Sequence, residues 1–502
     1  MRNEHRTKPA PNASQAAAPG GETYSIAGIA LFGIASFLAF ALGIFDTGPV
    51  GIISPGVCTL LAWVAFGVHL VLIGRHLGAF DFAIWLPVLM LFHYFGMAVA
   101  VEWLAPDQFP FYDPFGIGIP PKLDQSFLVA LIALLSFLFG MHVAGWRSAG
   151  GRPDPSPPKP DARFVGAAWT LLVLSMLMTF VGIPIAGREL IFGSYNELKM
   201  AQKLASADTR FFFTGTLLAT GGIIALIACY RPGHRLRLYA PVASAVFIGL
   251  ILVLTGDRTG LAVIAFGAGW AYSQRVRRAP WSATLAGYFV ALLLMPMIGE
   301  FREYRDVQDT RHLSIRGLAA NTFFEMGSTL GVFGYTIEHI PKDKGYDWGL
   351  SVVSALVNNI PNVGLTPGRF FALDTDPRSH NPGQWVTFMA NPTKWEINKG
   401  GYANAIAAEW YFNFGLIGVF LGMTLTGFAA GRIRNRARDG PIWLTFSGLF
   451  YVMLVISVRN AISYPLRCIL WPMVFLLVVR AVWPASNRRA AMPLEASSGA
   501  PR

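Results

Sequence analysis

The chain has 502 residues, of which 54% are hydrophobic and only 14% are charged, a balance far outside that of soluble domains. The solvent of most of the chain must therefore be lipid, which excludes a soluble architecture. The formal net charge of +12 is explained by the membrane topology described below, so it does not indicate a nucleic-acid partner.

Runs of apolar residues predict the membrane spans. About 20 mostly apolar residues are needed to cross a hydrocarbon core, and about twelve such runs follow one another along the sequence. They predict an all-α, polytopic transmembrane bundle with spans at 24–45, 51–74, 82–101, 126–146, 164–186, 211–230, 238–254, 259–273, 281–299, 405–430, 441–458 and 468–483.

The Lys and Arg residues predict the orientation, because they resist translocation across the membrane. With the N-terminus inside, 22 of the 40 Lys and Arg residues fall on inner segments, ten fall in the long loop 300–403, and eight remain for the short outer loops. We therefore expect a multi-pass protein with both termini in the cytoplasm.

The predicted organisation has five parts. They are a disordered cytoplasmic tail over 1–23, nine spans within 24–299, a large periplasmic loop over 300–403, three spans within 404–483 and a cytoplasmic tail over 484–502. Within the loop, residues 317–340 and 348–373 are apolar enough to lie on the membrane surface as amphipathic or re-entrant helices. An extra span there would move the basic residues of 432–438 outside, which the charge rule opposes.

Three outer segments carry arginine: Arg258 beside Asp257 in a tight turn, Arg302 with Arg305 after the ninth span, and Arg459 with Arg467 around Tyr464. Each has an ordinary explanation, respectively a hairpin turn, a salt-bridged helix end and snorkelling side chains. Their arrival on one side of the membrane favours an anionic ligand such as a lipid diphosphate, which guanidinium groups bind in bidentate fashion.

The run from Gly400 to Gly415 carries a carboxylate into the bundle. On a 3.6-residue period Tyr402, Glu409 and Asn413 share one helical face. An ionisable residue within a span indicates a functional site, although a polar clasp between helices is the alternative. Glycine pairs at four-residue spacing in the same span, at 418 and 422 and at 427 and 431, predict close helix packing.

The histidines provide one further candidate. His69 and His93 are lone histidines in apolar spans and are expected to be structural. His380, in the long loop, is retained as a proton acceptor, against the alternative of an ordinary surface histidine. Metal-ligand spacing is not found, and no metal ion or other cofactor is expected.

Two stretches resemble a known family. Thr255 to Gly260, at the outer end of an apolar helix, resembles the short arginine turn of the oligosaccharide repeat-unit polymerases, also called Wzy-type O-antigen polymerases. Gly401 to Gly418, reading GYANAIAAEWYFNFGLIG, resembles their helix after the large periplasmic loop. The resemblance covers roughly residues 240 to 470 in motifs and the rest in hydropathy. It implies an architecture similar to the membrane-embedded C-type glycosyltransferases.

The resemblance also implies a reaction. Undecaprenyl-diphosphate-linked glycans would be joined at the periplasmic face of the bacterial inner membrane, with inversion at the anomeric carbon and release of undecaprenyl diphosphate. The product would be lipopolysaccharide O-antigen or an exopolysaccharide. Expected partners are these lipid-linked glycans, membrane lipid, and also a chain-length regulator and a flippase, with no nucleic acid.

The implied chemistry needs a stabilised leaving group and a base for the attacking hydroxyl. The arginines at 258, 302, 305, 459 and 467 would stabilise the diphosphate. Glu409 is the first candidate for the base or for orienting the acceptor, followed by Glu300 and His380, and these roles rest on position alone. Asp257, Tyr402, Asn413 and Tyr464 are expected to contact the acceptor or to be structural.

Two rival functions remain. An O-antigen ligase would use the same lipid-diphosphate donor but transfer the glycan to a lipid A core. The stretch from Gly401 to Gly418 looks more like the polymerases. A lipid-sugar flippase or transporter ranks third, because no internal repeat is found and the charges lie at outer ends rather than at the bilayer midplane.

Overall fold

The computed structural model describes residues 20–46, 52–73, 80–108, 122–145, 160–186, 208–255, 258–277, 315–360, 380–398, 404–462 and 465–483, with residues 78, 112, 287 and 402. Within these ranges the chain is helical and forms no strand. Seven of the helices are long and apolar enough to cross a membrane. An all-α, polytopic membrane protein is thus confirmed, while the full number of about twelve spans stays a prediction.

The helices follow the apolar runs expected from the sequence. In chain order they are α1 (Gly20–Phe45), α2 (Pro55–Ile73), α3 (Phe82–Ala98) continuing as η2 (Val99–Leu104), α4 (Leu123–Val143), α5 (Ala162–Ala186), α8 (Asp208–Ala228), α9 (Leu236–Thr255), α10 (Arg258–Arg275), α19 (Ile406–Arg436), α20 (Pro441–Ser457) and α21 (Arg467–Val482). The expected ninth span, 281–299, lies outside the described residues apart from Gly287.

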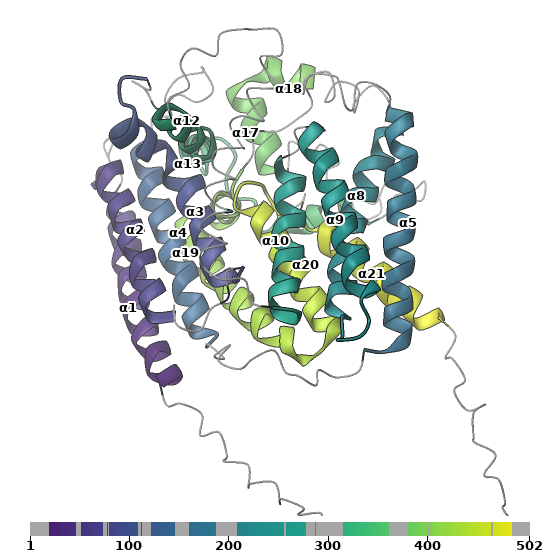
Figure 1. Ribbon diagram of the computed structural model, residues 1–502. Coiled ribbons are helices and arrows are strands. Elements are labelled where there is room, and N and C mark those ends of the chain that lie inside the picture. Colours follow the sequence, from purple (N-terminus) through teal and green to yellow (C-terminus); the bar gives the residue numbers. More distant parts are fainter. Residues whose placement is uncertain are drawn as a thin grey trace, which may run out of the picture.

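The interior of the bundle is formed by α3 and α4. In the most apolar stretch of each of these helices 89% of the residues are buried. The corresponding share is 22% in α1, which lies at the periphery (Figure 1). Helices in lipid gain little from hydrophobic burial, so small residues that allow close approach matter more. A Cβ added to Gly431 of α19 would lie 2.6 Å from the Cβ of Ala144, and one added to Gly427 would overlap the Phe137 carbonyl of α4. The close packing predicted for this glycine pair is confirmed.

The helix α19 is not the continuous span that 405–430 predicted. At Gly415 the backbone has φ 63° and ψ −151°, a conformation open almost only to glycine. Beyond this bend the second segment of the helix folds back along the first. The indole Nε1 of Trp410 lies 3.3 Å from the hydroxyl of Thr426, although the two residues are 16 positions apart. Gly418 and Gly422 leave the space that Trp410 occupies. The short first segment, which carries Glu409, therefore packs against the long segment that continues to Arg436.

Part of the predicted periplasmic loop forms a cap on the bundle. Its helices are α12 (Ile315–Gly327), α13 (Thr329–His339), α14 (Leu350–Asn358), α17 (Pro382–Ala390) and α18 (Pro392–Asn398). Figure 1 shows α17 and α18 at the top, whereas α1 begins and α21 ends toward the lower side.

The cap is attached to the interior helices. A Cβ on Gly327 of α12 would overlap the backbone of Met97 in α3, and α13 packs on α4. The segment 317–340 is thus held against the bundle by protein contacts. Of the segment 348–373, α14 exposes an apolar stripe, Leu350, Val353 and Leu356, and the part beyond residue 360 lies outside the described residues.

The end of the bundle away from the cap contains a buried ion pair. Nε and Nη2 of Arg434 donate to the two carboxylate oxygens of Asp81, each at 2.6 Å, and both side chains are almost fully buried. Asp81 also caps α3 by accepting from the Ala83 N–H. Nearby, His69 is paired rather than lone, with its Nδ1 3.1 Å from Nε2 of His142 and its Nε2 2.9 Å from the Ala83 carbonyl.

Candidate functional site

The turn that begins at Asp347 joins the cap to the bent helix α19. Trp348 and Gly349 both have positive φ angles, of 53° and 87°. Asn413 holds both residues, because its carbonyl accepts from the Trp348 N–H at 3.1 Å and its Oδ1 accepts from the Gly349 N–H at 2.8 Å. The Asp347 N–H also donates to the Phe412 carbonyl at 3.1 Å. The backbone of this turn is therefore fixed by α19.

Glu409 lies one helical turn before Asn413, and the shared face predicted for these two residues is present. Its Oε1 accepts from the Ser351 hydroxyl at 2.9 Å, and its Oε2 accepts from the Ile462 N–H at 2.6 Å. Nδ2 of Asn413 donates to the same Ser351 oxygen at 2.8 Å. Glu409 is only 3% exposed. Its carboxylate is thus held by protein donors and ties α14 to the segment after α20.

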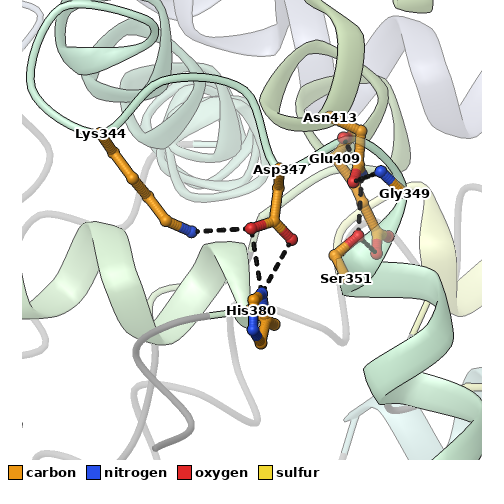
Figure 2. A network of polar contacts seen from close by, with 7 residues as sticks. All are labelled: Lys344, Asp347, Gly349, Ser351, His380, Glu409 and Asn413. Carbon is orange, nitrogen blue, oxygen red and sulfur yellow. Dashed lines mark hydrogen bonds and ion pairs between the residues drawn. The ribbon is translucent and has the colours of Figure 1, made fainter. Parts of the chain in front are cut away.

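A second network adjoins the first, as Figure 2 shows. Nδ1 of His380 lies 3.0 and 3.2 Å from the two carboxylate oxygens of Asp347. Nζ of Lys344 lies 3.1 Å from Oδ1 of the same carboxylate. Because a carboxylate accepts, Nδ1 of the neutral imidazole carries the proton and Nε2 is left as the basic nitrogen.

The His380 imidazole is partly exposed. Its side chain is 15% exposed, against 4% for Asp347. Within the described part of the chain, no group forms a hydrogen bond with Nε2. An orienting carboxylate on one nitrogen and an open second nitrogen form the arrangement that a general base requires.

Lys344 is held over aromatic rings. Its Nζ lies 4.1 Å from the ring centroid of Phe412 and 5.9 Å from that of Trp385, distances at which a cation interacts with a ring face. Burial lowers the pKa of Lys344 below its ordinary value, and Asp347 opposes this shift. The lysine therefore supplies positive charge beside a carboxylate that would otherwise be buried with histidine alone.

The segment from Arg459 to Arg467 reaches the same end of the bundle. It contains Ile462, which donates to Glu409, and Arg467 begins α21. Arg459 lies near enough to His93 of α3 for its positive charge to act on that imidazole. His93 in turn bonds the Met326 carbonyl of α12 at 3.1 Å, as expected for a structural histidine.

Arg258 is brought to this end by the antiparallel packing of α10 on α20. Gly267 faces Val452, whereas Trp270, further along α10, faces Gly448, earlier in α20. The first residue of α10, Arg258, therefore lies level with the end of α20, where Arg459 follows. The helix before α10, α9, ends at Thr255; residues 256 and 257 and the Arg258 side chain lie outside the described residues, so the tight turn between α9 and α10 stays a prediction.

Several predicted site residues cannot be assigned a position. Asp257, Glu300, Arg302, Arg305 and Tyr464 lie outside the described residues, so their roles remain predictions.

Tyr402 does not share the helical face predicted for it. The helix α19 begins only at Ile406, after an extended Ala405, so the 3.6-residue period does not reach back to Tyr402. Its side chain is instead buried in the cap beside Trp385 and Phe412. Tyr402 is therefore a packing residue of the cap in this structure.

The sequence interpretation missed Asp347, Ser351 and Lys344. Asp347 and His380 are separated by 33 positions and Ser351 and Glu409 by 58, and neither separation follows a helical period. The only local signal was the Asp-Trp-Gly triplet, which is typical of a turn. Among the described residues, no three His, Cys, Asp or Glu side chains are arranged to hold a metal ion.

Comparison with known proteins identifies the family. The family model described as O-antigen polysaccharide polymerase Wzy matches residues 162–485, which is more than half of the chain and includes both networks described above up to α21. Comparisons with curated proteins and with solved structures found no match. The general activity of the matched family is polymerisation of O-antigen polysaccharide. The chain therefore belongs to the O-antigen polysaccharide polymerase Wzy family, as its arginine turn and its 401–418 stretch had indicated.

Proposed function

We propose that this chain polymerises undecaprenyl-diphosphate-linked oligosaccharide repeat units at the periplasmic face of the bacterial inner membrane, by inverting glycosyl transfer. The contact between Asp347 and His380 carries the proposal, because it provides a base with one oriented and one open nitrogen. Family membership supports the class of reaction. The helices α17 and α18 of the cap lie at one end of the bundle, and α1 begins and α21 ends toward the other (Figure 1), which supports a cap outside and termini inside.

In the proposed reaction, a hydroxyl oxygen of the incoming repeat unit attacks the anomeric carbon of the growing chain. The bond from that carbon to the diphosphate oxygen breaks, the carbon is inverted, and undecaprenyl diphosphate leaves. The hydroxyl proton passes to Nε2 of His380. Asp347 keeps the proton on Nδ1 during the attack and stabilises the imidazolium that forms.

The geometry favours His380 over Glu409 as the base. Both oxygens of Glu409 already accept from protein donors and the residue is buried. We assign Glu409 a positioning role, since it holds the backbone at Ile462 and thereby the segment that carries Arg459 and Arg467. Glu300 stays a prediction.

Arginine is proposed to stabilise the leaving diphosphate. Arg459 and Arg467 flank the segment held by Glu409, and Arg258 begins a helix at the same end of the bundle. A guanidinium can bind two phosphate oxygens at once, and in a site shielded from water such contacts stabilise developing negative charge strongly. Arg302 and Arg305, which lie outside the described residues, are proposed to contribute as well.

The test is polymerisation by purified protein given its native lipid-diphosphate-linked repeat unit. We expect His380→Gln to lower the rate by about 10²- to 10⁴-fold, the usual contribution of a general base. Asp347→Asn should lower it comparably, because an amide that donates to Nδ1 moves the imidazole proton to Nε2. The readout is the glycan ladder formed per amount of folded protein.

A matched control is available within the cap. His339 contacts Asp343 four residues along the chain, outside both networks, and His339→Gln should leave the ladder intact. Equal losses in His339→Gln and His380→Gln would remove His380 as the base. A product on added lipid A core, with no ladder, would indicate a ligase. Neither product from the native donor would favour a transporter.

A further inference from the structure

Trp348 is held in an unusual conformation on the surface of the cap. It is 72% exposed, and it is the one residue other than glycine with a positive φ within the described part of the chain. Such a conformation is costly for a bulky residue and is kept only where its surroundings enforce it. The fold thus maintains a large exposed side chain in a costly position.

The enforcing residue is Asn413, which is fully buried. Its two oxygens accept from the N–H groups of Trp348 and Gly349, and its Nδ2 donates to Ser351 and to the Glu409 carbonyl, each at 2.8 Å. All polar groups of the Asn413 side chain are therefore used to fix this turn. The position of the indole is set from inside the protein rather than by contacts on the surface.

The Trp348 indole has two aromatic neighbours, and neither is stacked on it. The rings of Tyr346 and Phe414 meet it at interplanar angles of 81° and 71°, with centroids 5.9 and 6.1 Å away, so neither ring is stacked on it. Among the described residues, nothing accepts from its Nε1. A flat apolar face with a donor at one edge, directly after the Asp347 that holds His380, matches a pyranose ring, which has an apolar C–H face and hydroxyls at its rim.

A tryptophan at a lipid interface is the alternative, and the apolar stripe of α14 begins two residues later. Anchoring in lipid requires an apolar ring at the right depth and does not require a defined backbone angle. Strain enforced by a buried asparagine, next to the proposed base, favours a ligand that must be held in one orientation.

We propose that Trp348 is the stacking platform of the acceptor subsite, where it binds a sugar ring of the incoming repeat unit beside His380. This inference rests on the proposed function. It predicts that Trp348 acts on acceptor affinity, whereas His380 acts on the rate of the chemical step.

The experiment compares Trp348→Phe and Trp348→Leu, with Trp103→Leu as the control because Trp103 is also exposed, at 45%. Trp348→Leu should raise the apparent KM for the repeat unit by roughly 2- to 10-fold at unchanged kcat, the factor expected for loss of one aromatic contact. Trp348→Phe should retain most of the affinity. Trp103→Leu should match the wild type.

A binding measurement separates this inference from the polymerase assignment. The probe is the soluble repeat-unit oligosaccharide, free of lipid and diphosphate, added to protein in lipid nanodiscs and followed by saturation-transfer NMR. We expect transfer with wild type and Trp348→Phe and its loss with Trp348→Leu, whether or not a ladder is formed. Equal transfer with wild type and Trp348→Leu, or none with either, would overturn the proposal, as would an unchanged KM in an active Trp348→Leu enzyme.

Discussion

Asp81 and Asp347 are both buried carboxylates that meet a cation, yet the two regions differ in what remains unsatisfied. At Asp81, the guanidinium of Arg434 engages both oxygens at 2.6 Å and the pair is closed to solvent. At Asp347, Lys344 and His380 share the carboxylate, and within the described residues Nε2 of the imidazole has no hydrogen-bond partner. The first arrangement holds helices together, whereas the second leaves an imidazole nitrogen for the proton transfer proposed above.

This difference teaches that burial of a charge does not by itself identify a site. The Asp81–Arg434 pair has the burial and the cost of a functional group, but both of its carboxylate oxygens are engaged by the guanidinium. The capacity for chemistry lies in the unsatisfied atom. The two regions should accordingly respond in opposite ways to substitution, the first in stability and the second in rate.

The largest effect on stability is expected for Asp81→Ala. Removal of one partner leaves the Arg434 guanidinium buried without a counter-charge, which costs about 3–5 kcal/mol. Thermal unfolding in detergent should show a large decrease in Tm. The ladder formed per folded molecule should be unchanged, because the pair lies at the end of the bundle away from the cap.

The double variant Asp81→Asn with Arg434→Gln is the control for this prediction. It removes both charges and keeps a side chain that can cap α3. We expect it to recover most of the lost stability. If the double variant unfolds as readily as Asp81→Ala, the cause is not the unpaired charge.

A smaller effect, on both stability and polymerisation rate, is expected for Gly415→Ala. A Cβ there would lie 2.6 Å from the Tyr346 hydroxyl, and the backbone angles disfavour any side chain, so the loss should be about 1–3 kcal/mol. Because Tyr346 precedes Asp347, polymerisation should decrease as well. Gly67→Ala in α2 is the matched control, since no atom lies within 4 Å of the added Cβ. Equal behaviour of the two variants would contradict the role given to the bend.

The smallest effect is expected at Asp161, a third carboxylate that also pairs with an arginine but is exposed to water. Nε of Arg480 lies 2.9 Å from Oδ2 of Asp161, and both side chains are 39% exposed. This hydrogen bond lowers the pKa of Asp161 below its ordinary value of 3.8. The ionised form therefore stabilises the folded protein above pH 3.8, and this contribution is lost as the pH falls through the lowered pKa.

The measurement is the unfolding of Asp161→Asn compared with wild type. At pH 7 the difference should be below about 1 kcal/mol, because exposed pairs are screened by water. The difference should shrink toward zero in acid. A loss as large as that of Asp81→Ala would show that solvation does not separate the two pairs.

Hydropathy predicted the helices well, because lipid requires long apolar segments whose backbone groups are satisfied internally. The face shared by Glu409 and Asn413 was predicted for a similar reason, since four residues make one helical turn. The helical face predicted for Tyr402 was wrong because the helix begins after this residue, at Ile406. The bend at Gly415 was missed because an isolated glycine in an apolar helix has several explanations.

The chemistry of the site was harder to predict than its scaffold. The contact between Asp347 and His380 depends on how the cap folds back, which no local period encodes. The ranking of Glu409 above His380 came from depth in the membrane alone. The structure adds the partners of each group, and the partners decide which one has an atom left for a substrate.

The bond between Gly349 and Asn413 joins residues that are 64 positions apart in the sequence. Because a chain is made from its N-terminus, residues 347–349 are synthesised before Asn413. The turn that presents Trp348 and Asp347 therefore forms late, after α19 has bent at Gly415. A nascent chain that ends before Asn413 carries every residue of the Lys344–Asp347–His380 cluster and still lacks the means to assemble it.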